Sequence, residues 1–260
     1  MLQLLDKPMA IGKIGSSECR ALAAGRGWHE LTQLDLHDIY VGAGVFPPDP
    51  TSLQSFFSIY GNHLTDVDVI AKWLGPLEEK LINSYCPCAT SVELRDLEPY
   101  YWDDPWSQAL ENKNVLVISP FADSINSQYT KRELLWQDPK VLPKFNLRTI
   151  KCPLSWYVGK RDGSTWGAEF EDLKHEMEKE SFDICLIGAG AWSLPLAVHA
   201  KRLGKIGIHL GGALQILFGI KGARWDEHEV ISTFYNDAWI RPSKEETPPE
   251  VSKVEGGCYW

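Results

Sequence analysis

Short apolar runs alternate along this chain with segments in which apolar residues recur at helical spacing. The runs cover residues 9–14, 114–119, 182–187 and 206–210. Each is typical of a buried strand, and each is followed by a short loop of polar or glycine residues and then by a helical segment. Strand, loop and helix in repeated order predict parallel strands joined by crossover helices. We therefore expect an α/β, Rossmann-like fold with a mostly parallel sheet and flanking helices.

The segments between these runs predict helices. We expect them after the first loop as far as about Ala24, from Ile125 onward, over residues 166–177, over about 191–203, and through about Phe218. Apolar residues at spacings of three and four define the helix over 166–177. The helix over 191–203 ends at Gly204 with two cations in its last turn, as helix C-termini favour.

Residues 36–106 have a different pattern. Two helical segments, around residues 53–60 and 67–81, precede an acidic and aromatic stretch. They predict a mainly helical lobe inserted into the sheet domain. Residues 241–260 are rich in proline, glutamate and lysine, so we expect a tail that runs extended over the surface. The chain from 1 to 260 is then one α/β domain with this insertion and this tail.

Composition narrows the classes of function. Of the 260 residues, 44% are hydrophobic and 23% are charged, as in ordinary globular proteins. The 35 Asp and Glu outnumber the 26 Lys and Arg, which argues against a nucleic-acid partner. No apolar run reaches the roughly 18 to 20 residues of a membrane span, and the first residues lack the pattern of a secretory signal. The six dispersed cysteines fit a reducing compartment, so we expect a cytoplasmic protein.

The loops that follow the strands are the expected binding site, because ligands bind at the carboxyl ends of the strands in an open α/β sheet. These loops are residues 15–18, 119–124, 188–193 and 209–215. Their glycines and serines allow backbone N–H groups to approach an anion at a helix N-terminus. The sequence therefore predicts one cleft that binds a phosphorylated ligand. Its expected contributors are Gly15, Ser16, Ser17, Ser119, Ser124, Gly188, Gly190, Trp192, Gly211, Gly212 and Gln215.

Residues 188–193 are close to the dinucleotide-binding fingerprint G-x-G-x-x-G. Ser193 replaces the last glycine, and His209 stands where the fingerprint has its ribose-binding acid. A tight turn that holds a helix against the sheet is therefore favoured over NAD or flavin binding.

The D-x-D sequence at residues 66–68 is like the one with which many sugar transferases hold a divalent cation. Residues 65–68 are also typical of a helix N-cap with an acid at the third position, opening a helix at VIAKWL. Because a metal-binding D-x-D follows a buried strand, the capping interpretation is favoured.

Three charged residues are candidates for chemistry. Glu18 lies in the first turn after the first loop and is well placed to point into the cleft, although an acid there is also favoured by the helix dipole. Lys221 and Arg224 follow the last glycine turn. They either neutralise a leaving diphosphate or act as helix C-terminal cations that need no ligand.

Eleven tryptophans are an unusual number for a chain of this length. An indole face can stack on a sugar ring or a base. Five lie near predicted loops or strand ends and are stacking candidates: Trp28, Trp102, Trp106, Trp192 and Trp225. Trp192 and Trp225 come first because they adjoin the glycine turns. Trp73 and Trp166 have apolar neighbours at helical spacing and are expected in the core.

Residues 11–22, IGKIGSSECRAL, resemble the opening motif of the GT-D glycosyltransferases, whose signature is approximately R-x-G-D-G-E. Residues 182–225 resemble that family's later strand, helix, strand and glycine turn, and VLVISPFADS at 115–124 is a third block. The resemblance implies a Rossmann-like sheet that binds a nucleotide diphosphate sugar and transfers the sugar to an acceptor hydroxyl.

The acid-x-acid pair of this family is associated with a divalent metal, Mn2+ or Mg2+, and with the diphosphate. Gly15 matches the turn glycine and Glu18 the second acid, whereas Ser16 replaces the first acid. This replacement puts the metal in question, since a hydroxyl is a poorer ligand for a hard cation. The resemblance implies that Glu18 positions a cation or acts as general base, with Asp123 and His209 as competing bases. An ordinary histidine pKa of about 6.5 suits that role.

The resulting hypothesis is a glycosyltransferase that moves a sugar from a nucleotide diphosphate sugar, with UDP favoured, to a hydroxyl of a glycan acceptor with inversion. Two alternatives remain. One is a Rossmann-type enzyme with a nucleotide cofactor, either an NAD oxidoreductase or a methyltransferase. The other is a non-catalytic carbohydrate-binding module that uses exposed aromatic side chains.

Overall fold

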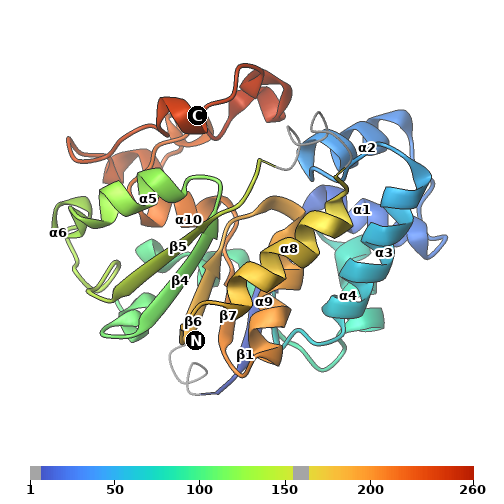
Figure 1. Cartoon of the computed structure of the whole chain (residues 1–260), viewed down its shortest axis with the longest axis horizontal. Helices are drawn as coiled ribbons and strands as arrows, with labels where there is room; N and C mark the ends of the chain where they lie inside the picture. Colours follow the sequence, from blue (N-terminus) through green and yellow to red (C-terminus); the bar gives the residue numbers. More distant parts are fainter. Residues whose placement is uncertain (1–6, 155–163) are drawn as a thin grey trace.

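A computed structural model describes residues 7–154 and 164–260 and contains one seven-stranded sheet (Figure 1). Its strands are β1 (Met9–Lys13), β2 (Val69–Lys72), β3 (Thr90–Glu93), β4 (Asn114–Ser119), β5 (Asn146–Lys151), β6 (Ile184–Ile187) and β7 (Ile206–His209). All paired strands are parallel. The α/β, Rossmann-like fold expected from the sequence is therefore confirmed.

Helices cover both faces of this sheet. They are α1 (Ser16–Gly25), α2 (Gln33–His37), α3 (Pro50–Leu64), α4 (Pro76–Tyr85), α5 (Ala122–Tyr129), α6 (Arg132–Leu135), α8 (Trp166–Glu178), α9 (Ser193–Arg202) and α10 (Gly212–Leu217). Helices α1, α3, α4, α8 and α9 pack on one face, and α5, α6 and α10 pack on the other. Trp166 is the first residue of α8 and is fully buried, as its spacing predicted. No helix in the described residues has the length and apolar composition to cross a membrane.

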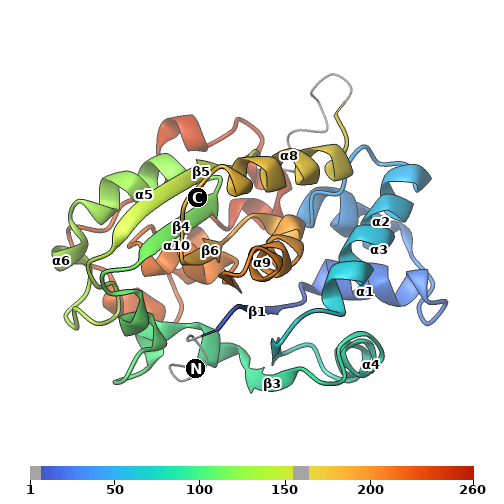
Figure 2. The same cartoon turned by 60° about the horizontal axis from the view of Figure 1, so that its bottom comes forward.

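The strand order places a switch point in the middle of the sheet. The order is β3-β2-β1-β7-β6-β4-β5, and Figure 2 shows β5, β4, β6, β1 and β3 in succession across the molecule. The chain proceeds from β1 through β2 to β3 at one edge, whereas the later strands build the other half. Ligands in open α/β sheets bind at such a reversal, outside the carboxyl ends of the strands. Here the reversal lies between β1 and β7.

The segment over residues 36–106 differs from the expected helical lobe. It contains α3 and α4, but also β2 and β3, which form one edge of the sheet. The sequence VIAK was expected in a helix and is strand β2. Its side chains alternate between the two faces of the sheet: Ile70 packs on one side, Val69 and Ala71 on the other. A short, fully buried strand has the same apolar composition as a buried helical turn, which explains the error.

The D-x-D sequence is neither a helix cap nor a metal site. The Asp68 carboxylate accepts a hydrogen bond from the backbone N–H of Ala10 at 2.9 Å and an ion pair from Lys201 at 2.8 Å. Asp66 pairs with Arg202 at 2.6 Å. These contacts join the amino ends of β1 and β2 to the end of α9, at the opposite edge of the sheet from the carboxyl ends.

The tail over residues 241–260 is not extended. It forms the short 3-10 helices η9 (Lys244–Glu246), η10 (Val251–Lys253) and η11 (Glu255–Gly257), and it lies above the sheet in Figure 1. The buried carboxylate of Glu246 holds its first part against the N-terminus of α5. The tail therefore returns to the carboxyl edge of the sheet.

Remaining short helices connect the main elements. They are the π-helix η2 (Asp38–Gly42) and the 3-10 helices η3 (Leu94–Leu97), η4 (Pro99–Tyr101), η5 (Trp106–Leu110), η6 (Gly190–Trp192), η7 (Ala223–Trp225) and η8 (Ile231–Phe234). Helix η6 leads directly into α9, which lies against β1 and β7. A Cβ on Gly207 of β7 would lie 2.2 Å from the carbonyl oxygen of Ala197 in α9, so this glycine sets the distance between helix and sheet.

Candidate functional site

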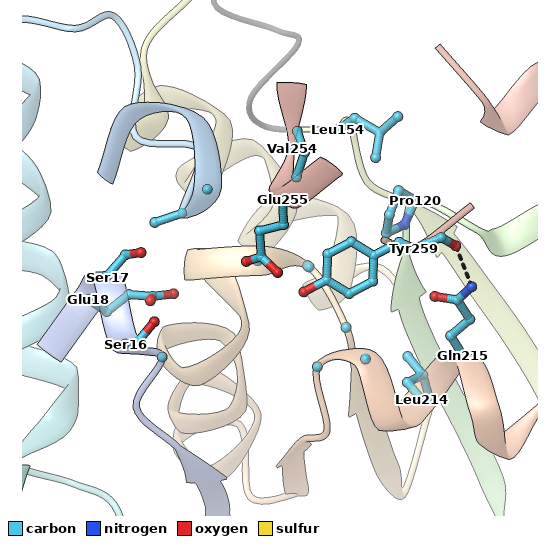
Figure 3. Close-up of a pocket in the computed structure, with 18 of the residues that line it drawn as sticks. Ser16, Ser17, Glu18, Pro120, Leu154, Leu214, Gln215, Val254, Glu255 and Tyr259 are labelled. Carbon is cyan, nitrogen blue, oxygen red and sulfur yellow. Dashed lines mark hydrogen bonds between the residues drawn. The ribbon is translucent and has the colours of Figure 1, made fainter. Parts of the chain in front are cut away.

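A cavity of about 740 Å³ opens at the carboxyl ends of β1, β4, β6 and β7 (Figure 3). This volume lies within the range of small-molecule sites. All four predicted loops contribute to its wall. The predicted residues found there are Gly15, Ser16, Ser17, Glu18, Ser119, Gly188, Gly190, His209, Gly211, Gly212, Gln215 and Arg224.

The loop after β1 presents the N-terminus of α1 to the cavity. Gly15 is the N-cap residue, Ser16 and Ser17 begin the helix, and none of the described side chains caps it. The first backbone N–H groups of a helix have no partner within the helix and carry partial positive charge. The start of α1 therefore favours an anion in the cavity.

Glu18 is the buried carboxylate of this site, with 8% of the residue exposed. Burial raises the pKa of Glu18, while its own backbone N–H and the charge of Lys13 act in the opposite direction. The carboxylate folds back over the N-cap, so that a Cβ on Gly15 would lie 2.1 Å from Oε2. A raised pKa makes the Glu18 carboxylate a stronger base than an exposed glutamate, which suits it to accept a proton.

Gly15→Ala should displace Glu18 without unfolding the protein. The backbone of Gly15, at φ −72° and ψ 158°, accepts alanine, and the added methyl group meets only the flexible end of the Glu18 side chain. We expect a nearly unchanged melting temperature. The catalytic activity proposed below should fall about 100-fold, because a misplacement of a catalytic group by about 1 Å can cost that much. Gly42→Ala is the control: it adds a methyl group to the same cavity wall, but its Cβ would lie 3.7 Å from the Ser17 hydroxyl oxygen, an ordinary contact, and does not meet Glu18. Full turnover in Gly15→Ala would show that this carboxylate position is unimportant.

Lys13 is a site residue that none of the sequence patterns singled out. It ends β1 and lies in the cavity wall, with Nζ 5.5 Å from the centre of the Trp73 ring. Burial lowers the pKa of Lys13, and the neighbouring Arg224 also lowers it, whereas Glu98 and Glu18 raise it. The signal was present, because Lys13 occupies the position of the arginine in the signature R-x-G-D-G-E.

His209 is in the cavity wall but does not have the expected properties of a base. Its Nδ1 lies 3.0 Å from the carbonyl oxygen of Lys13, which assigns an N–H to Nδ1. Burial and, to a smaller extent, the charge of Lys13 lower the pKa of His209 to about 3, although the hydrogen bond to the Lys13 carbonyl acts in the opposite direction. The imidazole is therefore neutral at neutral pH and a weak proton acceptor. Its position beside a buried lysine overturns the expectation of an ordinary pKa.

Asp123 and Ser124 lie outside the cavity. Asp123 forms an ion pair with Lys151, and its side chain is largely exposed. The backbone N–H groups of Asp123 and Ser124 donate to the Glu246 carboxylate at 2.9 and 3.1 Å, as does the Ser124 hydroxyl. The anion site expected at this loop is thus filled by the chain's own carboxylate. The sequence pattern could not reveal this partner, which lies more than a hundred residues away.

The two leading tryptophan candidates belong to the core. Trp192 is fully buried between Phe46 and Trp166, and its indole N–H donates to the carbonyl of Trp166 at 3.0 Å. Trp225 packs against Gly212 and Gly222. Neither lines the cavity, because burial of an indole ring in a packed core is strongly favoured. Trp28, Trp102 and Trp106 are not part of the cavity wall either.

Of the tryptophans that the structure describes, Trp73 and Trp260 line the cavity instead. Trp73, assigned to the core from its spacing, is 45% exposed and lines the cavity. It follows strand β2 at the carboxyl edge of the sheet, so the mistaken helix at VIAKWL also misplaced this side chain. Its indole N–H donates to the carbonyl of Ile14 at 2.9 Å, which fixes the ring at the cavity wall.

Arg224 reaches the cavity but Lys221 does not. The Lys221 ammonium lies 5.1 Å from the centre of the Tyr235 ring, outside the wall. Arg224 pairs with Glu255 and donates to the Tyr259 hydroxyl at 3.3 Å. Figure 3 shows Glu255 and Tyr259 across the cavity from Ser16, Ser17 and Glu18. The C-terminal segment thus supplies one wall, which no motif indicated.

The glycine loop after β6 packs tightly. A Cβ on Gly188 would lie 2.9 Å from the carbonyl oxygen of Gly211, and the Ser193 hydroxyl accepts a hydrogen bond from the N–H of Ala189 at 2.8 Å. This geometry supports the interpretation as a tight turn between two adjacent loops.

The residues at the α1 loop do not fit a divalent metal. Within the described part of the chain, no three His, Cys, Asp or Glu side chains are grouped to hold one. The donors near Ser16 are one carboxylate and two serine hydroxyls, and the charge of Lys13 acts on that carboxylate. Hard cations prefer several oxygen ligands, including carboxylates. Among the described residues, the cations in the cavity wall are Lys13, Arg20 and Arg224, and Arg20 is already paired with Asp35 and Asp38.

Comparison of the chain with protein-family models, curated proteins and solved structures finds no match. The resemblance to the GT-D glycosyltransferases therefore remains a prediction. The function is therefore inferred from the residues and geometry of the cavity.

Proposed function

We propose that this protein is a glycosyltransferase that uses a nucleotide diphosphate sugar, UDP-linked in the first instance, and a hydroxyl of a glycan as acceptor. The supporting observation is the combination of charges in one cavity at the switch point of the sheet. The buried carboxylate of Glu18 lies in one wall, with Lys13 beside it and Arg224 in the wall as well. This combination suits a reaction that removes a proton from an acceptor and releases a diphosphate.

Lys13 and Arg224 would stabilise the leaving diphosphate. Both are cations at the cavity wall, and the N-terminus of α1 adds its partial positive charge. Preorganised cations are most effective where negative charge develops in the transition state. Their contribution requires no metal ion.

Glu18 would act as general base. In the proposed step, the acceptor oxygen forms a bond to the anomeric carbon while the bond from that carbon to the diphosphate oxygen breaks. The electron pair stays with the diphosphate, and the acceptor proton moves to the Glu18 carboxylate. A single displacement of this kind inverts the anomeric carbon. Asp123 is outside the cavity and His209 is a weak base, so neither competes with Glu18 for this role.

The two alternative functions explain less of the cavity. A dinucleotide enzyme would use the glycine loop after β6, but there Gly188 packs on Gly211, and Ser193 occupies the N–H of Ala189. A carbohydrate-binding module would use exposed aromatics; Trp73 in the cavity wall is one, but Trp192 and Trp225 are buried. Neither alternative requires a buried carboxylate beside cations.

A thermal-shift panel tests the proposal. UDP, GDP, NAD and S-adenosylmethionine are each added with and without manganese, followed by the sugar nucleotide of whichever nucleotide stabilises the protein. We expect UDP or GDP to raise the melting temperature, since a ligand at 100 times its dissociation constant adds about 2.7 kcal/mol of stability. Transfer is then measured as release of the nucleoside diphosphate.

The variant Lys13→Met links this shift to the cavity. It should remove most of the nucleotide-dependent stabilisation, whereas Lys113→Met, an exposed lysine remote from the cavity wall, should retain it. Stabilisation by NAD or S-adenosylmethionine alone would contradict the proposal. Stabilisation by oligosaccharides but by no nucleotide would favour a binding module.

A further inference from the structure

Arg224 is held by a carboxylate of its own chain. Its guanidinium forms an ion pair with Glu255 and lies 4.6 Å from the centre of the Tyr259 ring. Both members of the pair line the cavity, with 37% of the Arg224 side chain and 48% of the Glu255 side chain exposed. The Glu255 carboxylate therefore occupies the position on Arg224 that an anionic ligand would take.

Glu246, in the same C-terminal segment, is a carboxylate that is fixed in place by several hydrogen bonds. It is 2% exposed and accepts hydrogen bonds from the N–H groups of Asp123, Ser124 and Ser243 and from the Ser124 hydroxyl. Within residues 7–154 and 164–260, Glu255 has one cationic partner, Arg224, and one weak contact from the Cys258 thiol at 3.4 Å. Of the two carboxylates, Glu255 is the one that an incoming anion can displace.

The backbone around Glu255 is suited to a change of position. Glu255 has φ +46°, and the next residues, Gly256 and Gly257, have φ +69° and +81°. A non-glycine residue in the left-handed region is strained and is kept there by its contacts. The two glycines that follow can rotate freely, because they have no Cβ.

The segment is attached on both sides of this turn. Glu246 anchors its beginning on α5. At its end, the carbonyl of Tyr259 accepts from Gln215 at 2.7 Å, and the N–H groups of Ala223 and Arg224 donate to the carbonyls of Trp260 and Cys258 at 3.0 Å. The turn at 250–257 can therefore move while its ends stay in place.

We propose that Glu255 is a substitute for a ligand phosphate: it occupies Arg224 when the cavity holds no ligand and gives way to a phosphate of an incoming diphosphate. The proposal rests on the proposed function only in requiring a ligand with a phosphate group. A guanidinium binds phosphate through two parallel hydrogen bonds, which a single carboxylate contact does not match. Glu255 then also disfavours neutral ligands, which cannot replace it on Arg224.

Titration calorimetry with inorganic pyrophosphate tests this exchange. Glu255→Gln should bind pyrophosphate about two- to fivefold more tightly than the unmodified protein, the range expected for loss of a partly exposed ion pair. Glu227→Gln is the matched control. It makes the same change in charge three residues from Arg224, at an exposed glutamate outside the cavity wall, and should leave the affinity unchanged.

Hydrogen exchange supplies a second measurement that needs no variant at position 255. Pyrophosphate should increase exchange of the backbone amides over residues 250–257 in the unmodified protein, and this increase should be absent in Arg224→Gln. Unchanged or weaker binding by Glu255→Gln, absence of pyrophosphate binding, or greater protection of 250–257 would each overturn the proposal.

The outcome is separable from that of the proposed function. Tighter pyrophosphate binding by Glu255→Gln without turnover of any nucleotide sugar would support the exchange at Arg224 and contradict the transferase. If the unmodified protein turns over a nucleotide sugar but Glu255→Gln binds pyrophosphate no more tightly than it does, the transferase is supported and the exchange at Arg224 is contradicted.

Discussion

Replacing Glu18 by glutamine should abolish the proposed sugar transfer and at the same time raise the melting temperature of the protein at neutral pH. Removal of a general base lowers turnover by about 100- to 10,000-fold. Glutamine has nearly the shape of the protonated carboxyl group and carries no charge. Because burial is the main cause of the raised pKa of Glu18, the charged form is the one that the folded protein tolerates poorly.

The pH dependence of this gain in stability follows from the direction of the shift. The ordinary pKa of 4.5 applies to Glu18 in the unfolded chain, and the folded value is higher. The folded state therefore binds the extra proton more tightly, and the free energy of unfolding falls as the pH rises from 4.5 through the folded pKa. Glu18→Gln is free of this loss. Its melting temperature should match that of the unmodified protein below pH 4.5 and exceed it at pH 7 and above.

The measurement pairs turnover with thermal unfolding across pH 4 to 8. Glu111→Gln, at an exposed glutamate outside the cavity wall, is the control and should change neither quantity. Turnover retained in Glu18→Gln would remove this residue from the mechanism. A lower melting temperature at neutral pH would instead mean that the charged carboxylate stabilises the fold.

A single methyl group at Gly207 should destabilise the protein strongly. In Gly207→Ala the new Cβ would lie 2.2 Å from the carbonyl oxygen and 2.5 Å from the Cα of Ala197, so the backbone of α9 has to move away from β7. Helix α9 also packs on β1, where a Cβ on Gly12 would lie 2.6 Å from the Leu194 side chain. Neither backbone can relax as a side chain does, and overpacking of this kind costs about 3 kcal/mol.

The expected fall in melting temperature is about 6 to 12 °C for a chain of this size, measured by circular dichroism. Gly42→Ala is again the control, since it adds the same methyl group at an ordinary van der Waals distance of 3.7 Å from the Ser17 hydroxyl oxygen and should change stability by less than about 0.5 kcal/mol. A melting temperature within a degree of the unmodified protein in Gly207→Ala would show that α9 is not closely packed on the sheet.

Two of the three strands that were missed lie at the edges of the sheet. Strands β1, β4, β6 and β7 are interior and have continuous apolar runs. Strands β3 (TSVE) and β5 (NLRTIK) form the two edges and are polar at many positions, so they have little apolar pattern to detect. Strand β2 is interior and apolar, but the acids that precede it suggested a helix cap.

The candidate site divides in a similar way. The loops at its base follow from the strand ends, because parallel strands bring their carboxyl ends to one edge. The partners of these loops do not follow from any local pattern. His209 meets the carbonyl of Lys13 across 196 positions of sequence, and Ser124 meets Glu246 across 122.

Local patterns of apolar and polar residues were thus sufficient for the α/β class, four of the five interior strands and the location of the cavity, since burial between two helix layers imposes a period that short segments reveal. The ionisation of Glu18, Lys13 and His209, the burial of Trp192 and the exposure of Trp73 depended on the tertiary structure. So did the occupation of two expected anion sites by Glu246 and Glu255. Desolvation and charge pairing are set by neighbours that are distant in the chain, and no local window of sequence contains them.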